Sequence, residues 1–315
     1  MNYKIECEEK QVDKSNALHF ETERTLLREY QKIHNNQKDE IAKWAVHKIR
    51  TDKKDETVVP TIPFIGKRYF EQDKRILVYA SAENLANYCY GEISDRPWLD
   101  DDEKAGNRHR LCFDNQEAQT KVIPYVHCGP MDTGLLLTAV MYLVWKLNIS
   151  DISNISPREF CETICFGNYG KYSIETKEQE RKRKGNDKKR LNKNIDYAGN
   201  IDLMSASHSF IETDIKELKP DYIILPATMY NSAKKFIDSI KGTAKIIPIM
   251  QMLASNVNNH IAPNKKRINK YKCYTVEELH PTIQNVYREM TDVSLNNYLY
   301  VFGYLDTVLS TINDK

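Results

Sequence analysis

The sequence has no apolar run long enough to cross a membrane. Its longest uncharged apolar stretch, Thr133 to Trp145, is shorter than the roughly 20 residues that a membrane-spanning helix requires. The N-terminus is charged and lacks the apolar core of a secretory signal, and the seven cysteines are scattered along the chain. These absences predict no membrane partner and a reduced, cytoplasmic setting.

The chain also lacks the common motifs of cofactor and metal chemistry. It has no Gly-x-Gly-x-x-Gly, and no Gly-Lys-Ser/Thr follows Gly129 to Gly134, which argues against dinucleotide and nucleoside-triphosphate binding. Cys161 and Cys165 are four residues apart without further ligands nearby, and this favours free buried cysteines over a metal site. Ser205 and His208 are not flanked by a strand-Ser-helix elbow. We therefore expect no metal and no cofactor.

Charge alone does not identify a partner. The net charge is +2, which is too small to indicate nucleic acid unless basic residues cluster locally. The strongest cluster lies within residues 175–193, which contain too few apolar residues to fold alone. Two interpretations remain open for this basic insertion: a mobile loop that contacts a ligand, or a solvated insertion without a role.

Short apolar runs alternate with helical patterns along most of the chain. Four runs predict inner strands: Arg75–Tyr79, Thr163–Tyr169, Tyr222–Pro226 and Lys245–Met250. Pro248 predicts an edge or irregular position for the last run, because proline cannot donate to a sheet ladder. The alternation predicts an α/β fold, a three-layer α/β/α domain with a mainly parallel central sheet of about four strands.

Helical periodicity is clearest between these runs and at both ends of the chain. The expected helices cover residues 21–50, 133–147, 201–218, 231–240 and 295–309. Residues 1–20 show no sustained period, and His34 to Asn36 are a candidate break. The predicted organisation is an N-terminal helical segment and linker over 1–57, followed by a single α/β domain over 58–315.

Polar side chains follow three of the expected strands. Ser81, Glu83 and Asn84 follow the first, Asn168 and Tyr169 end the second, and Gln251 and Ser255 follow the fourth. Open α/β sheets bind ligands at this edge. An amide donates and accepts hydrogen bonds in one plane, which suits a nucleobase edge, and an amide or carboxylate can position a water. A plain strand-to-helix turn capped by Ser81 or Asn84 is the alternative.

Basic residues near these segments are candidates for holding phosphate groups. They are Arg108, Arg110, Lys171, Arg181, Arg183, Lys265 and Arg267. For Arg108 and Arg110, composition alone favours the alternative of a solvated turn or local ion pairs.

Three of these segments resemble motifs of the uracil-DNA glycosylase superfamily. Ala82–Glu83–Asn84–Leu85 is similar to its water-positioning turn, Phe166–Gly167–Asn168–Tyr169–Gly170–Lys171 to its pocket-asparagine segment, and Met250 to Ser255 lies where its last DNA-facing loop belongs. The resemblance implies that Asn84, with Glu83, positions water and that Asn168 contacts the base. Ala82 and Leu85 replace the family's Gly and Pro, and His260 comes later than its loop histidine.

The resemblance implies a hydrolase that acts on the N-glycosidic bond of a nucleobase in DNA, with a role in DNA repair and DNA as the partner. Two alternatives remain. One is a catalytically inactive member of the fold that binds nucleic acid or another partner. The other is a small-molecule enzyme that acts on a nucleoside or a sugar phosphate. The sequence does not predict an oligomeric state.

Overall fold

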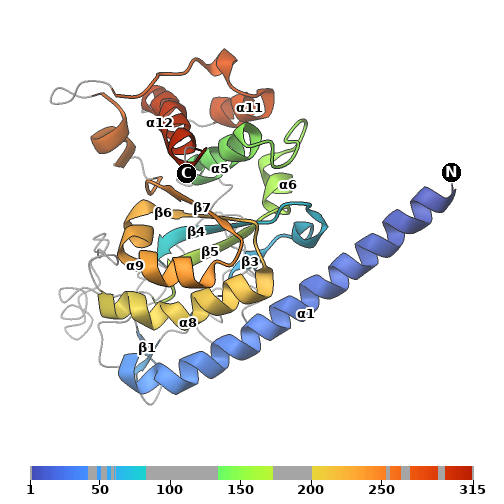
Figure 1. The fold of residues 1–315 in the computed structure, drawn as a ribbon, viewed down its shortest axis with the longest axis vertical. Coiled ribbons are helices and arrows are strands. Elements are labelled where there is room, and N and C mark those ends of the chain that lie inside the picture. Colours follow the sequence, from blue (N-terminus) through green and yellow to red (C-terminus); the bar gives the residue numbers. More distant parts are fainter. Residues whose placement is uncertain are drawn as a thin grey trace.

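A mostly parallel sheet forms the middle layer of the protein. The computed structural model describes residues 2–41, 48–50, 55–57, 60, 62–82, 134–172, 201–252, 256–263, 270–289 and 295–313. Their main sheet has the strand order β3–β5–β4–β6–β7 (Figure 1). The strands are β3 (Phe64–Ile65), β4 (Ile76–Ala82), β5 (Cys165–Gly170), β6 (Tyr222–Pro226) and β7 (Lys245–Ile249). Four of them are parallel to one another, and β3 is antiparallel to β5.

Helices cover both faces of this sheet. One face, the α5 side, carries α5 (Gly134–Lys146), α11 (Pro281–Glu289) and α12 (Leu295–Asn313) (Figure 1). The other face, the α8 side, carries α8 (Ile201–Leu218), α9 (Ala227–Ile240) and the N-terminal helix α1 (Asn2–Ile41). Side chains of β4 alternate between the two: Ile76 and Val78 pack on the α5 side, and Leu77 and Tyr79 on the α8 side. The predicted α/β fold with three layers is therefore confirmed, and β3 adds a fifth strand.

Shorter elements complete the description. They are β1 (Lys48–Arg50), β2 (Asp55–Thr57), η1 (Tyr69–Glu71), α6 (Pro157–Cys161), η5 (Val257–Ile261) and η6 (Val276–Glu278). β1 and β2 pair antiparallel with each other. Ser156 caps α6, because its hydroxyl accepts from the backbone N–H of Glu159 while the Glu159 carboxylate accepts from the backbone N–H of Ser156. None of the described helices is long and apolar enough to cross a bilayer.

The helix α1 is longer than the sequence pattern predicts. It begins at Asn2, continues through the expected break at His34 to Asn36 and ends at Ile41. The helix expected over 21–50 is therefore wrong at its end, because Lys48–Arg50 form the strand β1. No glycine or proline interrupts this stretch, so the backbone remains helical although its first residues have no apolar period. The first part of α1 projects beyond the body in Figure 1, whereas Leu26, Tyr30 and Ile41 are buried on the α8 side.

One further boundary differs from expectation. α9 begins at Ala227, directly after β6, rather than near residue 231. The capping box of Thr275 and Glu278 opens only the short η6, because Leu279 is extended and Pro281 begins a separate helix, α11. β7 is an edge strand, as Pro248 predicts. The proposed domain boundary at residue 57 remains a prediction.

Candidate functional site

The carboxyl ends of the parallel strands bring two of the predicted site segments together. In the β4–β5 register Ala80 lies opposite Asn168, and Ala82 lies opposite Gly170. β4 is central: the chain forms β5 on one side of it and β6 on the other. Such a reversal of strand order marks the place where open α/β sheets bind ligands. Ser81 and Asn168 therefore lie at the same end of neighbouring strands.

Asn168 has an unused amide at this edge. Its side chain is half-buried, and among the described residues it forms no hydrogen bond. By strand alternation it shares the α5 side with Phe166, and Ala80 beside it contributes only a methyl group. A half-buried amide is stabilised by a hydrogen-bonding partner, so this position suits a ligand or ordered water.

Two more predicted residues lie near the strand ends, in different settings. The Ser81 hydroxyl oxygen is buried and forms no hydrogen bond within the part of the chain that the structure describes. Alternation places Ser81 on the α8 side with Tyr79, not on the side of Asn168. Gln251 follows β7 and is half-buried, and its backbone carbonyl accepts from Asn256 Nδ2 at 3.1 Å.

Lys171 does not bind phosphate, contrary to the sequence prediction. Its Nζ lies 2.7 Å from Asp214 Oδ2, and both side chains have 0% exposure. A cation enclosed in this way cannot reach a phosphate outside the protein. Tyr169 is also a core residue rather than a substrate contact, since it is fully buried with its ring edge-on to Tyr79.

Asp214 of α8 is the centre of a buried polar cluster on the α8 side. Tyr30 of α1 donates to Oδ1 at 2.6 Å, and Tyr79 of β4 donates to Oδ2 at 2.9 Å. The Lys171 ammonium lies 5.2 Å from the Tyr30 ring centroid and 5.4 Å from that of Tyr79. Burial, and then the Asp214 charge, raise the pKa of Tyr79 well above its ordinary value, so the phenol remains a donor. The Asp214 cluster joins α1, β4, α8 and the segment after β5.

The segment after β5 contacts α1 a second time, through Tyr172. His34 Nδ1 and Gln37 Nε2 of α1 lie 3.0 Å and 2.9 Å from the Tyr172 hydroxyl. Burial, and then the nearby Lys38, lower the pKa of His34 to about 4. His34 is therefore neutral at physiological pH and can share a hydrogen bond with the phenol. The Lys171 backbone N–H also donates to Ser207 Oγ of α8 at 3.0 Å.

Sequence reasoning missed Asp214 although a signal was present. Ser207, Asp214 and Leu218 share the face of α8 that also carries Phe210 and Ile211, and all five are buried. A carboxylate within the apolar face of an amphipathic helix indicates a buried charge with a partner. Its partners lie far away in sequence, however, and the helical pattern does not name them.

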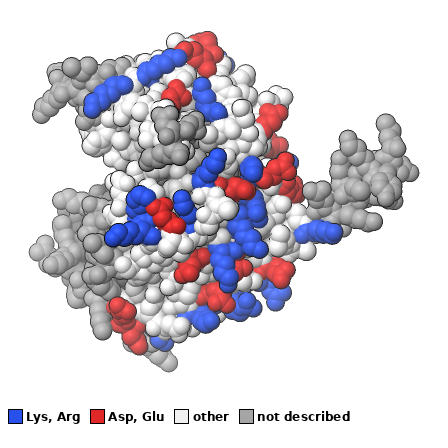
Figure 2. Space-filling model, in the orientation of Figure 1, with Lys and Arg blue, Asp and Glu red and all other residues white. Residues whose placement is uncertain are grey.

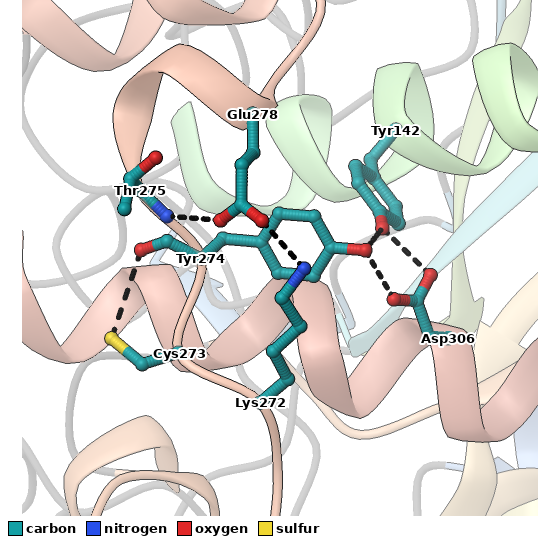
Figure 3. Close-up of polar contacts among 7 residues, drawn as sticks. All are labelled: Tyr142, Lys272, Cys273, Tyr274, Thr275, Glu278 and Asp306. Atoms are coloured by element: carbon teal, nitrogen blue, oxygen red, sulfur yellow. Dashed lines mark hydrogen bonds and ion pairs between the residues drawn. The ribbon is translucent and has the colours of Figure 1, made fainter.

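A second carboxylate cluster lies on the α5 side (Figure 3). Tyr142 of α5 donates to Asp306 Oδ1 of α12 at 2.6 Å, and Tyr274 donates to Oδ2 at 2.5 Å. The two hydroxyl oxygens are 3.0 Å apart, and each has one proton, which it directs to the carboxylate. Burial, followed by the hydrogen bond to Asp306, raises the pKa of Tyr142 far above its ordinary value. The Asp306 cluster ties α5 and α12 to the segment before η6.

Lys272 is a neighbour of the Asp306 cluster but does not neutralise it. Its Nζ lies 2.7 Å from Glu278 Oε1 and 4.1 Å from the centroid of the Tyr274 ring (Figure 3). Among the described residues, no lysine or arginine forms an ion pair with Asp306. The carboxylate is half-buried, so solvent supplies part of its stabilisation.

The remaining predicted site residues lie outside the described part of the chain. They are Glu83, Asn84, Arg108, Arg110, Arg181, Arg183, Ser255, Lys265 and Arg267. Their proposed roles stay predictions.

Cysteine chemistry differs in part from expectation. Cys165 is free and buried, as predicted, whereas Cys161 is disulfide-bonded. Within the described ranges, no three His, Cys, Asp or Glu side chains lie close enough together to hold a metal ion.

A polar hollow lies at the opposite, amino edge of the sheet. It has a volume of about 290 Å³, and Arg68, Gln72, Asp151 and Glu159 are among its lining residues. These residues precede β4 and β5, so the hollow is separate from the strand ends that carry Asn168. Its acids and its arginine partly neutralise one another, and no predicted site residue lines it.

Comparison of the chain with protein-family models, with curated proteins and with solved structures found no match.

Proposed function

We propose that this chain binds a nucleobase of DNA at the carboxyl edge of its sheet and hydrolyses the N-glycosidic bond of that base, as the uracil-DNA glycosylases that it resembles do. The observation that carries the proposal is the Asn168 amide. It is half-buried at the strand ends and forms no hydrogen bond among the described residues.

The surroundings of Asn168 support this role. Ala80, its partner across the β4–β5 pair, is too small to cover the amide from the neighbouring strand. In the proposed complex a flat base packs over Ala80, and the Asn168 amide donates to and accepts from its edge. The protein extracts the base from the helical stack, because the reacting bond is inaccessible within a duplex.

Asn84 and Glu83 supply the water in this proposal. Glu83 and Asn84 follow Ala82, the last residue of β4, by one and two positions respectively. A water held by the Asn84 amide attacks the sugar carbon, its proton passes to the Glu83 carboxylate, and the base leaves with the electron pair of the broken bond. Phosphates on either side are held by Arg181, Arg183, Lys265 and Arg267.

The test is release of free base from oligonucleotides that contain uracil or a damaged base. Wild type is compared with Asn84→Ala, Asn168→Ala and Asn168→Asp, with Asn285→Ala, an exposed amide on α11, as the matched control. We expect at least a tenfold loss for the site variants and none for the control, because each removes a contact to water or base (about 1.4 kcal/mol per tenfold). No release by wild type across a broad panel of lesions would remove the catalytic claim.

A binding role without catalysis is the second candidate. Ala82 and Leu85 replace the glycine and proline of the family's water-positioning turn, which favours it. This candidate predicts no base release but tighter binding to modified than to unmodified DNA, with the preference abolished in Asn168→Ala. Thermal stabilisation by nucleosides but not by oligonucleotides would instead indicate the small-molecule enzyme.

The proposal includes a DNA-repair role in the cytoplasm. Stable disulfides are rare in that compartment, so the disulfide bond at Cys161 argues against the cytoplasmic part of the proposal. Mass spectrometry of alkylated protein from its native cell distinguishes the two cases: a labelled Cys161 thiol supports the cytoplasmic setting, and an unlabelled one contradicts it.

A further inference from the structure

A group of cations, most of them exposed and Arg75 and Lys241 half-buried, lies away from the candidate site. It covers the second half of α9, the last turn of α8 and the loops that precede β4, β6 and β7, at or near the amino edge of the sheet. We call it the basic surface. Its members are Lys67, Arg68, Lys74, Arg75, Lys216, Lys219, Lys234, Lys235, Lys241 and Lys245. Figure 2 shows lysine and arginine side chains gathered over this part of the molecule, with acidic side chains among them.

The basic surface concentrates positive charge that the whole chain does not have. Residues 67–75 and 216–245 contain ten lysines and arginines and five acidic residues, a net +5, whereas the entire chain has a net charge of +2. The rest of the chain is therefore acidic overall. Charge separated in this way produces a local field that attracts anions.

Two of the five acidic residues within the basic surface, Asp221 and Asp238, are each shared by two cations. Asp221 lies 3.9 Å from the Lys74 ammonium and 4.0 Å from Arg75 Nε. Asp238 pairs in the same way with Lys234 and, at 3.7 Å, with Lys241. One carboxylate cannot neutralise two cations, so positive charge remains after these pairs form.

Lys219, Lys235 and Lys245 of the basic surface, like Lys67, have ammonium groups without a carboxylate partner among the described residues. Lys219 precedes β6, Lys235 lies on α9, and Lys245 begins β7, and all three are exposed. Lys245 Nζ lies 5.9 Å from the ring centroid of Tyr222, its neighbour across the β6–β7 pair. These flexible ammonium groups are available to an external anion.

The composition of the basic surface favours a phosphate backbone as its partner. The large apolar side chains that the described residues expose are Leu18 and Phe20, and both lie on α1. A protein partner usually needs buried aromatic or apolar anchors, and a membrane surface needs apolar side chains that insert. Lysines spread over several loops instead match a row of phosphates, which they contact as point charges without reading bases.

We propose that the basic surface binds the phosphate backbone of duplex DNA without sequence preference, as a second contact at the edge of the sheet opposite Asn168. This contact is independent of base hydrolysis. It holds a second stretch of the nucleic acid on which the proposed site acts, or a second duplex.

The test measures the affinity for a short, labelled, undamaged duplex over a range of salt concentrations. The triple variant Lys219→Gln/Lys235→Gln/Lys245→Gln is compared with Lys14→Gln/Lys32→Gln/Lys270→Gln, which removes equal charge from exposed positions elsewhere. Each lost phosphate contact lowers the slope of log affinity against log salt by about 0.9, so we expect a decrease of about 3 and at least a tenfold loss of affinity at low salt for the first variant. The control variant keeps nearly the wild-type slope.

Three results would overturn the proposal: no duplex binding by wild type at low salt, equal effects of the two triple variants, or a polyglutamate peptide that competes as well as DNA of equal charge. Thermal unfolding shows whether each variant is folded. Asn285→Ala, which changes an exposed amide on α11, keeps wild-type affinity for the undamaged duplex. If wild type releases no base but still binds the duplex through these lysines, the proposed function is contradicted and the proposed role of the basic surface is supported.

Discussion

The two faces of the sheet each hold a carboxylate that accepts from two tyrosine hydroxyls, but they stabilise it differently. Asp214 on the α8 side is fully buried and is paired with Lys171. Asp306 on the α5 side is half-buried, and no described lysine or arginine pairs with it. Removing a carboxylate from water is costly, and the cost rises with burial. The comparison therefore predicts that single changes at the Asp214 cluster destabilise the protein more than equivalent changes at the Asp306 cluster.

The largest effect is expected for Lys171→Met. It leaves Asp214 buried without a counter-charge, which typically costs about 3–5 kcal/mol of unfolding free energy. Urea denaturation measures this loss. Lys272→Met, which removes a lysine beside the Asp306 cluster, is the control and is expected to unfold close to wild type, because Lys272 is exposed and pairs with Glu278. Equal losses in the two variants would contradict the comparison.

A double variant sharpens this result. Lys171→Met/Asp214→Leu removes both charges together, and apolar replacements of a buried ion pair are often tolerated. We expect the double variant to be more stable than Lys171→Met alone. A double variant that is less stable would show that the hydrogen bonds of Asp214, rather than charge balance, dominate.

The next effect is expected for Gly303→Ala on the α5 side. A Cβ at this position of α12 would lie 2.2 Å from the backbone carbonyl oxygen of Lys272. The backbone must move apart, which costs about 1–3 kcal/mol and separates the Tyr274 segment from Asp306. Thermal unfolding measures the loss, and faster alkylation of Cys273, next to Tyr274, reports the displaced segment. An unchanged melting temperature would show that α12 adjusts without cost.

Removing one hydroxyl from each cluster gives a matched pair of smaller effects. Tyr79→Phe takes a donor from the buried Asp214, and a hydrogen bond to a charged group contributes about 1.5–3 kcal/mol. Tyr274→Phe takes a donor from the half-buried Asp306, where water can replace it, so we expect about 1 kcal/mol. Denaturant midpoints rank the two variants. The reverse order would show that solvent does not replace the hydrogen bond that Asp306 loses in Tyr274→Phe.

The smallest effect is a pH dependence confined to the α8 side. His34 has its pKa lowered to about 4 in the folded protein, against an ordinary value near 6.5. Below pH 6.5 the unfolded chain binds this proton and the folded chain does not, so stability falls as the pH falls from about 6.5 to about 4. His34→Gln is expected to lack this part of the slope, as measured by denaturation across that range. An identical slope in wild type and variant would assign it to other groups.

The sequence predicted the elements of this fold better than the contacts among them. Apolar runs and helical periodicity indicate local states that depend on nearby residues, and β6 (Tyr222–Pro226) and α8 (Ile201–Leu218) have the predicted bounds. The prediction failed at the start of α1, because a charged segment without apolar period can still be helical. It also failed at Cys161 and Lys171, whose partners lie outside the local pattern.

The candidate site shows the same division. The polar residues at the strand ends were identifiable, because Ser81 follows one apolar run with the pattern of a strand and Asn168 lies at the end of another. The face of the sheet on which each residue lies was not identifiable from the sequence. Alternation places Asn168 on the α5 side and Ser81 on the α8 side only once the register of β4 and β5 is known. The Lys171 side chain enters the core three residues after Asn168, and the sequence pattern did not distinguish the two environments.

The sequence by itself determined the class of fold and the edge of the sheet at which polar residues gather, because these follow from periodicity and from small residues at strand ends. Only the tertiary structure decided which charged side chains are buried, which pair with more than one partner and which remain free to contact an external ligand. That outcome depends on groups such as Lys171 and Asp214, which meet across 43 positions of the chain. Whether a cation contacts a carboxylate or solvent is a question of distance in space, and distance along the sequence does not report it.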